Sequence, residues 1–598
     1  MNTMKNFFYT SLLFIFSLVT YAQSVNYHLT MPMPQNHYFE VEMNLNDFEG
    51  DYIDIQMPIW APGSYLAREF ARHVNLVKAK DGSGKELEVY KRNKNTWRIE
   101  KGSAKEVKVN YEVYAFELSV RTSFLDLTHG YVNGSSVFMY PENHKNLSGE
   151  LQITPHQSFK KISTALPTKG EGLANENNSK VFTFENYDHL ADSPIEIGNQ
   201  ETFTFDAAGV KHTVAMYGVG NYDIPTLKKD MAAVVESATN VFNENPNKEY
   251  LFIIHNVVNG GGGLEHCAST TLSVNRWTYE GSAYLGFLSL VAHEYFHLWN
   301  VKRIRPVELG PFNYNEENYT SLLWVMEGFT SYYDELLLRR AGFYSEDEYL
   351  SKLKSTINYV EGSVGNKVQP VAHASYDAWI KAYRSNENSS NTTVSYYPKG
   401  QLLASVIDAM IIKTYKGKKS LDDFMRVLWN KYYKELNRGF SEDEFQQELE
   451  SFLKMDLNAF FRDYIFGVKT IPYNAYFSEV GLEVKDISTA KPSFGASVSG
   501  SNGNVVVRRI RANSAAEEAG LSVNDEIISF NGFRVDATSF NQYVDGLKSN
   551  EAFTLIISRD DILMVLEPKM GEYKQDTYDF ELDTNEKSLA RYWLRTDN

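Results

Sequence analysis

Hydrophobic and polar residues alternate along the first third of the chain, from residue 24 to about residue 205. Clear examples are residues 38–45 (YFEVEMNL), 107–114 (VKVNYEVY) and 180–185 (KVFTFE). Turn-forming clusters such as residues 80–84 (KDGSG) separate them. A period of two is typical of strands with one buried face, and several short strands at this spacing predict an N-terminal β-sandwich-like domain over residues 23–205.

After about residue 206 the pattern becomes mainly helical. Residues 225–245 are predicted to form a helix and residues 250–255 a strand, and long apolar helical stretches follow at 282–300, 319–340, 401–415 and 419–435. These elements predict a mostly helical domain over residues 206–475.

The C-terminal part returns to short strands over residues 478–570, with two short helical segments. We interpret it as a separate module. The last stretch, residues 571–598, is polar and acidic and has no assignable pattern. The predicted fold class is therefore multidomain α+β.

The N-terminus has the pattern of a secretory signal peptide. Lys5 precedes an apolar run over residues 7–19, and residues 20–22 (TYA) supply small residues before a cleavage point at Gln23. We predict a signal peptide over residues 1–22 and a bacterial protein that is exported, either periplasmic or secreted. Because the apolar run is short for a bilayer, we expect no membrane span in the mature chain.

Net charge and cysteine content exclude one class of partner and one kind of cross-link. The formal net charge is −17, which argues against nucleic acid as a partner. The single cysteine, Cys267, allows no internal disulfide.

Candidate metal chemistry centres on residues 293–297 (HEYFH). On a helix, His293 and His297 lie on one face with Cβ atoms roughly 5–6 Å apart, a gap that one divalent ion can bridge. Glu294 lies beside this pair and could take a proton from metal-bound water. We predict one zinc ion per chain with Glu294 as the catalytic base; a helix with two ordinary histidines is the alternative.

A catalytic zinc needs a third protein ligand, and three glutamates compete for that place. Glu316 and Glu317 lie 19 and 20 residues after His297, a spacing found in some zinc peptidases with this motif. They lie, however, in a segment typical of a loop. Glu327 lies in a strongly helical segment, and a second helix is a stiffer support, so we favour Glu327. Asp334 is two turns further along the same face, where it could orient a ligating histidine; a surface salt bridge is the other interpretation.

Residues 293–306 (HEYFHLWNVKRIRP) and 324–333 (WVMEGFTSYY) resemble the glycyl aminopeptidase family of gluzincin zinc metallopeptidases. The resemblance covers most of the mature chain and supports Glu327. It implies an N-terminal β domain, a thermolysin-like catalytic domain and a C-terminal PDZ domain. It also implies an aminopeptidase that removes N-terminal residues, Gly or Ala, from peptides with a free N-terminus.

Two further segments resemble parts of related aminopeptidases. Residues 260–266 (GGGGLEH) resemble their glycine-rich exopeptidase loop, in which Gly262 and Gly263 would lie close to the peptide and Glu265 would bind its ammonium group. Residues 396–400 (YYPKG) match their Tyr-x-Lys-Gly segment, which makes Tyr397 the candidate hydrogen-bond donor to the oxyanion. The alternatives are a glycine-rich hairpin for the loop and core packing for the tyrosine.

Residues 493–496, 505–510 and 514–532 resemble a PDZ domain, a fold that binds extended peptides along a sheet edge. The candidate carboxylate-binding loop is residues 493–495 (SFG). Two other functions remain open. One is a zinc endopeptidase with the same site. The other is a non-catalytic PDZ-containing protein that binds exported polypeptides and keeps a vestigial zinc site.

Overall fold

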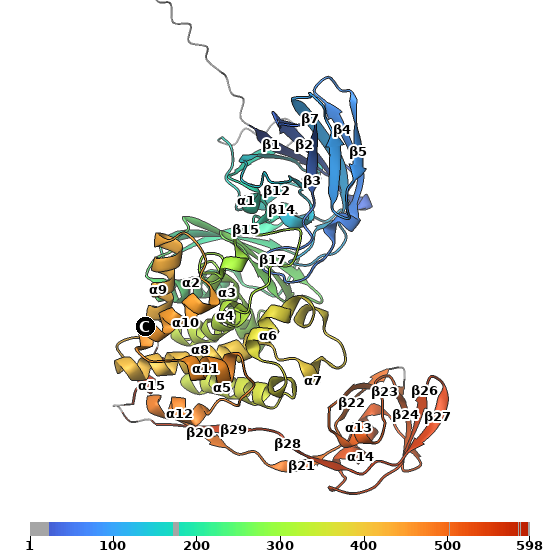
Figure 1. The fold of residues 1–598 in the computed structure, drawn as a ribbon, viewed down its shortest axis with the longest axis vertical. Coiled ribbons are helices and arrows are strands. Elements are labelled where there is room, and N and C mark those ends of the chain that lie inside the picture. The colour runs from blue at the N-terminus through green and yellow to red at the C-terminus, as the bar shows by residue number, and fades with distance from the viewer. Residues whose placement is uncertain (1–22, 171–178, 502, 584, 586–587, 596–598) are drawn as a thin grey trace, which may run out of the picture.

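The computed structural model describes residues 23–170, 179–501, 503–583, 585 and 588–595, and the predicted signal peptide lies outside them. Figure 1 shows a β-rich N-terminal domain, a helical middle domain and a small C-terminal β module. The predicted multidomain α+β class is confirmed. In the part of the chain that is described, no helix is long and apolar enough to cross a bilayer.

The N-terminal domain consists of a ten-stranded and a four-stranded sheet that share one hydrophobic core. The alternation seen in the sequence recurs as burial, since every second residue of β2 and β7 is buried. The ten-stranded sheet has the order β10 (Tyr140–Pro141), β3 (Tyr52–Gln56), β6 (Thr96–Glu100), β5 (Glu86–Lys91), β4 (Val74–Asp81), β7 (Glu106–Tyr114), β2 (Tyr38–Asn46), β1 (Ser24–Thr30), β11 (Gly149–Thr154), β13 (Lys180–Phe184). The four-stranded sheet has the order β12 (Lys161–Thr164), β14 (Ile195–Gly198), β9 (Gly130–Val132), β8 (Phe124–Leu125), and helix α1 (Tyr187–Ala191) precedes β14.

The middle domain combines a five-stranded mixed sheet with a helical body. The sheet has the order β15 (Glu201–Ala207), β16 (Val210–Tyr217), β17 (Glu249–Val257), β19 (Ser269–Asn275), β18 (Gly263–Glu265), so β18 is an edge strand. It begins at Glu201, a few residues before the predicted domain boundary. The helices are α2 (Ile224–Phe242), α3 (Gly281–Phe296), α4 (Leu323–Arg340), α5 (Glu346–Glu361), α6 (Val371–Tyr376), α7 (Ser389–Thr392), α8 (Tyr396–Tyr415), α9 (Leu421–Leu428), α10 (Glu442–Leu453), α11 (Asn458–Phe460) and α12 (Tyr473–Phe477).

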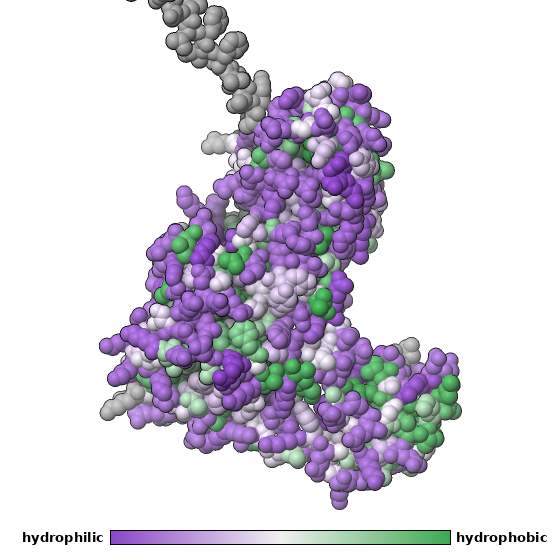
Figure 2. All heavy atoms as spheres, viewed as in Figure 1, coloured by the Kyte–Doolittle hydropathy of each residue, from purple (hydrophilic) through white to green (hydrophobic). Residues whose placement is uncertain are grey.

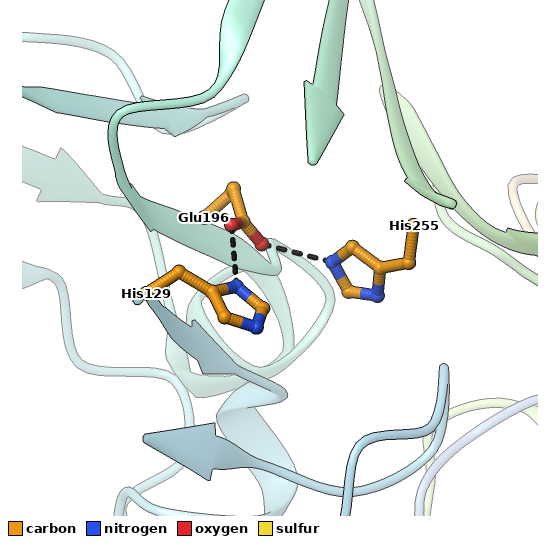
Figure 3. A group of neighbouring side chains, drawn as sticks. All are labelled: His129, Glu196 and His255. Carbon is orange, nitrogen blue, oxygen red and sulfur yellow. Dashed lines mark hydrogen bonds and ion pairs between the residues drawn. The ribbon is translucent and has the colours of Figure 1, made fainter. Parts of the chain in front are cut away.

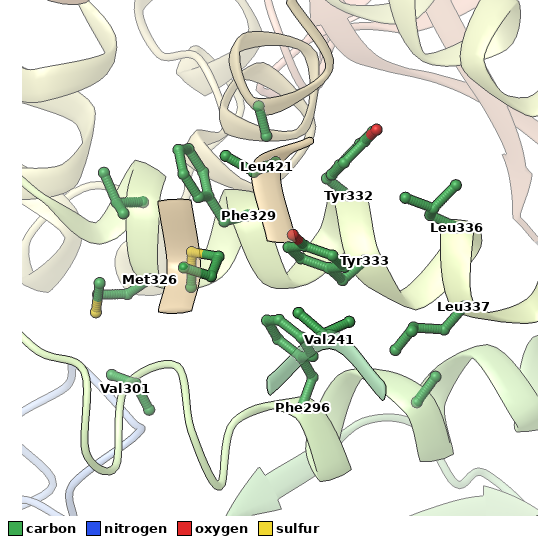
Figure 4. Close-up of a cluster of buried hydrophobic side chains, with 14 of the residues drawn as sticks. Val241, Phe296, Val301, Met326, Phe329, Tyr332, Tyr333, Leu336, Leu337 and Leu421 are labelled. Atoms are coloured by element: carbon green, nitrogen blue, oxygen red, sulfur yellow. The ribbon is translucent and has the colours of Figure 1, made fainter. Parts of the chain in front are cut away.

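Helix α4 lies in the centre of this domain and is buried on almost every face. Figure 4 shows Phe296 of α3, Val241 of α2 and Leu421 of α9 packed around Phe329 and Tyr333 of α4. A helix that is apolar all round is held by tertiary packing, and its side chains have little freedom to move. A side chain of α4 that binds a metal ion would therefore be held in a fixed position.

The C-terminal module has its own small core and a sheet of β22 (Ala496–Ser501), β23 (Asn504–Ile510), β24 (Glu526–Phe530), β26 (Leu555–Arg559) and β27 (Ile562–Leu566), with β25 (Phe533–Arg534) paired to β24. Helices α13 (Ala515–Glu518) and α14 (Ala537–Asp545) complete it. Figure 2 shows apolar side chains gathered over β26 and β27 on the outer side of this module, where Ile562 and Leu563 are about two-thirds exposed.

Residues after 570 return to the middle domain. β28 (Gly571–Lys574) pairs with β21 (Ala490–Ser493), and β29 (Tyr578–Leu582) pairs with β20 (Leu482–Asp486), so a two-stranded ribbon carries the module. Helix α15 (Ala590–Trp593) then packs into the helical core, where Trp593 donates a hydrogen bond of 2.8 Å to the Tyr332 hydroxyl of α4. Helix α15, from the segment that had no assignable pattern in the sequence, is therefore part of the middle domain.

A buried polar cluster joins the N-terminal domain to the middle domain (Figure 3). Both oxygens of Glu196 on β14 are used: Oε1 lies 2.7 Å from Nδ1 of His129, and Oε2 lies 2.9 Å from Nε2 of His255 on β17. All three side chains are fully buried. Burial by itself would raise the pKa of Glu196, but the two histidines outweigh it and hold the pKa below its usual value.

Replacement of Glu196 by glutamine is expected to destabilise the protein by about 3–5 kcal/mol, because an amide cannot accept a hydrogen bond from both imidazoles. Since the pKa of Glu196 is lowered, its contribution is present above the unfolded-state value of ~4.3 and is lost as the pH falls through the folded-state value. Thermal unfolding of wild type and E196Q at several pH values measures this. The difference should shrink in acid, and the exposed Glu185→Gln variant should show none. An equal difference at all pH values would contradict the assignment.

Candidate metal centre and active site

Three side chains from two adjacent helices converge on one point. His293 lies in the last turn of α3, His297 directly follows that helix, and Glu327 lies on α4. Nε2 of His297 is 3.3 Å and Nε2 of His293 is 3.5 Å from Oε2 of Glu327. Tetrahedral ligands at ~2.0–2.1 Å from one metal ion lie roughly 3.3–3.4 Å apart, so the spacing fits a shared ion.

The Nδ1 atom of each histidine, which points away from Glu327, forms a hydrogen bond. Nδ1 of His293 lies 2.9 Å from a carboxylate oxygen of Asp334, and Nδ1 of His297 lies 2.8 Å from the carbonyl oxygen of Asn300. Both acceptors require a proton on Nδ1, which leaves the lone pair of Nε2 directed at the shared point. A metal ion needs this tautomer. Asp334 therefore lies where the sequence placed it, on the far side of the imidazole of His293.

Glu327 is available as an anion. Burial would raise its pKa, but His297 and His293 outweigh it and hold the pKa at about 2. The competing residues Glu316 and Glu317 lie in the loop before α4, where Glu316 accepts a hydrogen bond of 2.6 Å from Asn313. Neither lines the cavity that contains the two histidines. The donor set of two imidazoles and one carboxylate suits a metal of the zinc type.

The buried Glu196 cluster has the same three residue types but not the same spacing. Its nitrogen–oxygen distances of 2.7 and 2.9 Å involve two different carboxylate oxygens and are ordinary hydrogen-bond lengths. The remaining ring nitrogens, Nε2 of His129 and Nδ1 of His255, are buried, and none of the three residues lines the cavity that contains His293 and His297. Among the described residues, the set on α3 and α4 therefore combines ligand spacing with an open position at a cavity.

Glu294 lies at the edge of the metal set, and its Oε2 atom is buried without a hydrogen-bond partner among the described residues. Burial, with smaller effects from the carboxylates of Glu265 and Glu327, raises the pKa of Glu294 to about 7 against the opposing effect of the two histidines. A carboxylate in this state can both accept and return a proton near neutral pH.

Gly263 lies directly against Glu294. A Cβ atom on Gly263 would approach within 2.4 Å of the Glu294 carboxyl group. A side chain at this position would displace the candidate base, which is the physical reason for glycine there. Gly262 and Gly263 both line the cavity of about 370 Å³ that contains the metal set.

Glu265 ends the edge strand β18, and its carboxylate is buried beside Glu294 and His297. Among the described residues, that carboxylate has no ion pair and no hydrogen bond, and it lines the same cavity. An unpaired buried carboxylate facing a cavity is suited to a cationic group of a ligand.

The N-terminal domain completes this wall of the site. A Cβ atom on Gly63 would lie 2.5 Å from the Glu265 carboxylate, so the turn at Gly63 packs against it. Arg121, from the loop between β7 and β8, lines the cavity and reaches the carbonyl oxygen of Gly263 at 3.5 Å. Sequence reasoning missed both residues, since neither lies in a recognisable motif and their neighbours in space are far away in sequence.

Tyr397 lies in the first turn of α8 and lines the same cavity as the glycine-rich loop. Its ring lies 6.2 Å from that of His293, in a stacked orientation. Burial raises the pKa of Tyr397 well above the ordinary value, so the phenol remains protonated and can donate a hydrogen bond. Lys399, two residues on, instead forms a buried ion pair of 3.5 Å with Glu361.

The residues that follow the histidine motif hold the loop in place. Trp299 stacks on Phe242 of α2 at 4.9 Å, and Asn300 donates to the carbonyl oxygen of Met326 on α4 at 2.9 Å. Lys302 forms a buried ion pair of 2.6 Å with Asp192 of the N-terminal domain. These contacts explain why the motif is longer than the five residues that carry the chemistry.

Comparisons with known proteins agree with this arrangement. Residues 26–199 match the family profile described as the Peptidase M61 N-terminal domain, residues 286–403 match M61 glycyl aminopeptidase, and residues 492–567 match the PDZ domain. The crystal structure of an aminopeptidase N family protein from Idiomarina loihiensis has 30% sequence identity and a TM-score of 0.88, over 96% of this chain and 100% of that one.

More distant structures share the fold alone. An M1 zinc metallopeptidase from Deinococcus radiodurans has 13% identity and a TM-score of 0.51, over 75% of this chain and 95% of that one. No curated protein matched the sequence.

Fold and site together define a metallopeptidase of the aminopeptidase class with an appended PDZ domain. The chain belongs to the M61 glycyl aminopeptidase family, which confirms the resemblance read from the sequence.

Proposed function

We propose that the protein is a zinc aminopeptidase that removes small N-terminal residues, Gly or Ala, from peptides. The observation that carries the proposal is the position of the unpaired carboxylate of Glu265 beside Glu294 and the three metal-binding side chains. A buried carboxylate at one end of a catalytic cavity can hold the free ammonium group of a peptide, so that the first peptide bond lies over the metal set.

His293, His297 and Glu327 would hold the zinc ion, which would lower the pKa of its bound water and polarise the scissile carbonyl. Glu294 takes a proton from the attacking water at its unpartnered Oε2 atom and later donates one to the leaving amine. Tyr397 donates a hydrogen bond from its protonated hydroxyl to the developing oxyanion. Asp334 and the Asn300 carbonyl keep the two imidazoles in the required tautomer.

The preference for a small N-terminal residue rests on the family to which the chain belongs and is supported by the close packing around Glu265. The Gly63 turn touches its carboxylate from one side, which restricts the space beside the ammonium position. The predicted signal peptide extends the proposal to an exported enzyme of a bacterium, and the PDZ domain extends it to the binding of a peptide segment.

Replacement of Glu265 by glutamine tests the aminopeptidase assignment. It removes the charge that would bind the ammonium group but keeps the size, so kcat/KM for a peptide with a free N-terminal glycine should fall roughly 10–100-fold. The measurement compares that peptide with its N-acetylated form. Glu201→Gln, on the opposite edge of the same sheet, is the matched control.

Two results would redirect the assignment. Efficient cleavage of the N-acetylated peptide by wild type would favour an endopeptidase with the same metal site. An equal loss in Glu265→Gln for free and blocked peptides would remove Glu265 from ammonium binding.

A further inference from the structure

A cleft of about 960 Å³ lies between the catalytic domain and the PDZ domain. The catalytic side includes α7 and the start of α8, and the PDZ side includes Ser493 and Gly495 of the loop that was predicted to bind a carboxylate. Asn391 of α7 ties the two sides together: it donates to the carbonyl oxygen of Ile510 at 2.8 Å and accepts from the amide of Ala512 at 2.9 Å. Figure 1 shows α7 on the side of the middle domain that is nearest to the PDZ domain.

The cleft adjoins the active site. Arg121 and Tyr397 line both the cleft and the smaller cavity with the metal set. Because Glu265 and Tyr397 line the same cavity, a peptide whose ammonium group lies at Glu265 can extend past Tyr397 into the cleft. The part of a peptide that leaves with the new N-terminus therefore has a path toward the PDZ domain.

The charge of the cleft is opposite to that of the chain. Its lining contains no Asp or Glu among the described residues, but it contains Arg121, Lys381, Arg509 and Arg511. Lys381 pairs with Asp377 at 3.0 Å, whereas the three arginines form no ion pair within the described part of the chain. In a protein with a formal charge of −17, unpaired arginines gathered in one cleft indicate an anionic ligand.

Two arginines of the PDZ domain reach the cleft. Arg509 lies near the end of β23, Arg511 directly follows that strand, and both line the cleft. Arg508, where the pairing with β22 is irregular, does not line the cleft and donates to Ser499 on β22 at 2.7 Å. Arg511 stacks over Tyr573 at 3.8 Å and donates to Ser493 at 3.1 Å. A guanidinium held this way is pre-organised to bind a carboxylate with its remaining N–H groups.

We propose that the cleft is a subsite for the C-terminal carboxylate of the peptide substrate, bound by Arg509 and Arg511 at the end of a path that Arg121 lines. The inference rests on the proposed aminopeptidase function and adds a second specificity element. An extended peptide advances ~3.3–3.6 Å per residue, so one short peptide can occupy both Glu265 and the arginines only over a narrow range of lengths. The enzyme then favours short free peptides over protein N-termini.

The test compares a series of alanine peptides with N-terminal glycine, each as the free acid and as the C-terminal amide. In the full-length zinc enzyme, kcat/KM for the free acid should exceed that for the amide roughly tenfold or more at the best length, because the amide lacks the charged hydrogen bonds. In the R509Q/R511Q variant the ratio should approach one. R508Q, at a neighbouring residue that does not line the cleft, should keep the wild-type ratio.

Arg511 packs on Tyr573, so the single variant R509Q, whose side chain is exposed, is measured as well and should lower the ratio without a change in thermal stability. Wild type that cleaves free acid and amide equally at every length would overturn the carboxylate subsite and leave the aminopeptidase intact. Wild type that cleaves only N-blocked peptides, or none, would remove the proposed function and this inference with it.

Discussion

Replacement of Glu294 by glutamine is expected to lower kcat by roughly 10²–10⁴-fold while the protein stays folded and keeps its metal. Glutamine preserves the shape beside Gly263 but cannot accept a proton from water. The side chain does not bond to His293 or His297, so the metal set should be unchanged. Steady-state kinetics on a glycine peptide, with zinc counted per chain, gives both quantities.

The matched control is Glu280→Gln. Glu280 precedes the first residue of α3, at the other end of the helix that carries Glu294, and its side chain is exposed. It should retain wild-type kcat. If E294Q kept full turnover with zinc bound, Glu294 would not be the base. Glu265, the other carboxylate beside the metal set, would then be the candidate for the base.

Replacement of Glu327 by glutamine is expected to have the second large effect, a loss of bound zinc together with activity. An amide is a poor metal ligand, and two imidazoles alone do not complete a catalytic site. Zinc per chain, measured after dialysis against buffer without metal, should fall from about one to near zero. Activity should return in part when excess zinc is added.

Glu316→Gln and Glu317→Gln are the controls, because these residues compete for the ligand role in the sequence but lie outside the metal cavity in the structure. Both variants should keep zinc and activity. If Glu317→Gln lost zinc while Glu327→Gln kept it, the third ligand would belong to the loop and the helix-borne assignment would be wrong.

Much of the fold follows from local pattern. The alternating segments became β2, β7 and β13, and the stretch predicted at residues 225–245 became α2, which Asp223 caps by accepting from the amide of Thr226. Such elements are set by residues near one another in sequence, so period and capping are sufficient to find them. Helix α4 was also predicted, but its burial on nearly all sides became visible only with the helices that surround it.

The candidate site was likewise predicted only in part from local sequence. His293, Glu294 and His297 are adjacent in sequence, and their spacing on one helix alone indicates metal and base. The sequence also indicated Glu265 and Tyr397, through resemblance to segments of related enzymes. That both side chains line one cavity with the two histidines comes from the structure.

The sequence by itself therefore determined the α+β organisation, the metal motif with its base, and the PDZ module, because each is a local pattern. Only the tertiary structure decided that Glu327 and not Glu316 faces the histidines, since this depends on how α4 packs on α3. It also brought Gly63 and Arg121 of the N-terminal domain to the catalytic cavity, and it brought helix α15 into the helical core. These contacts join distant parts of the chain, and burial and packing, which no short segment encodes, hold them together.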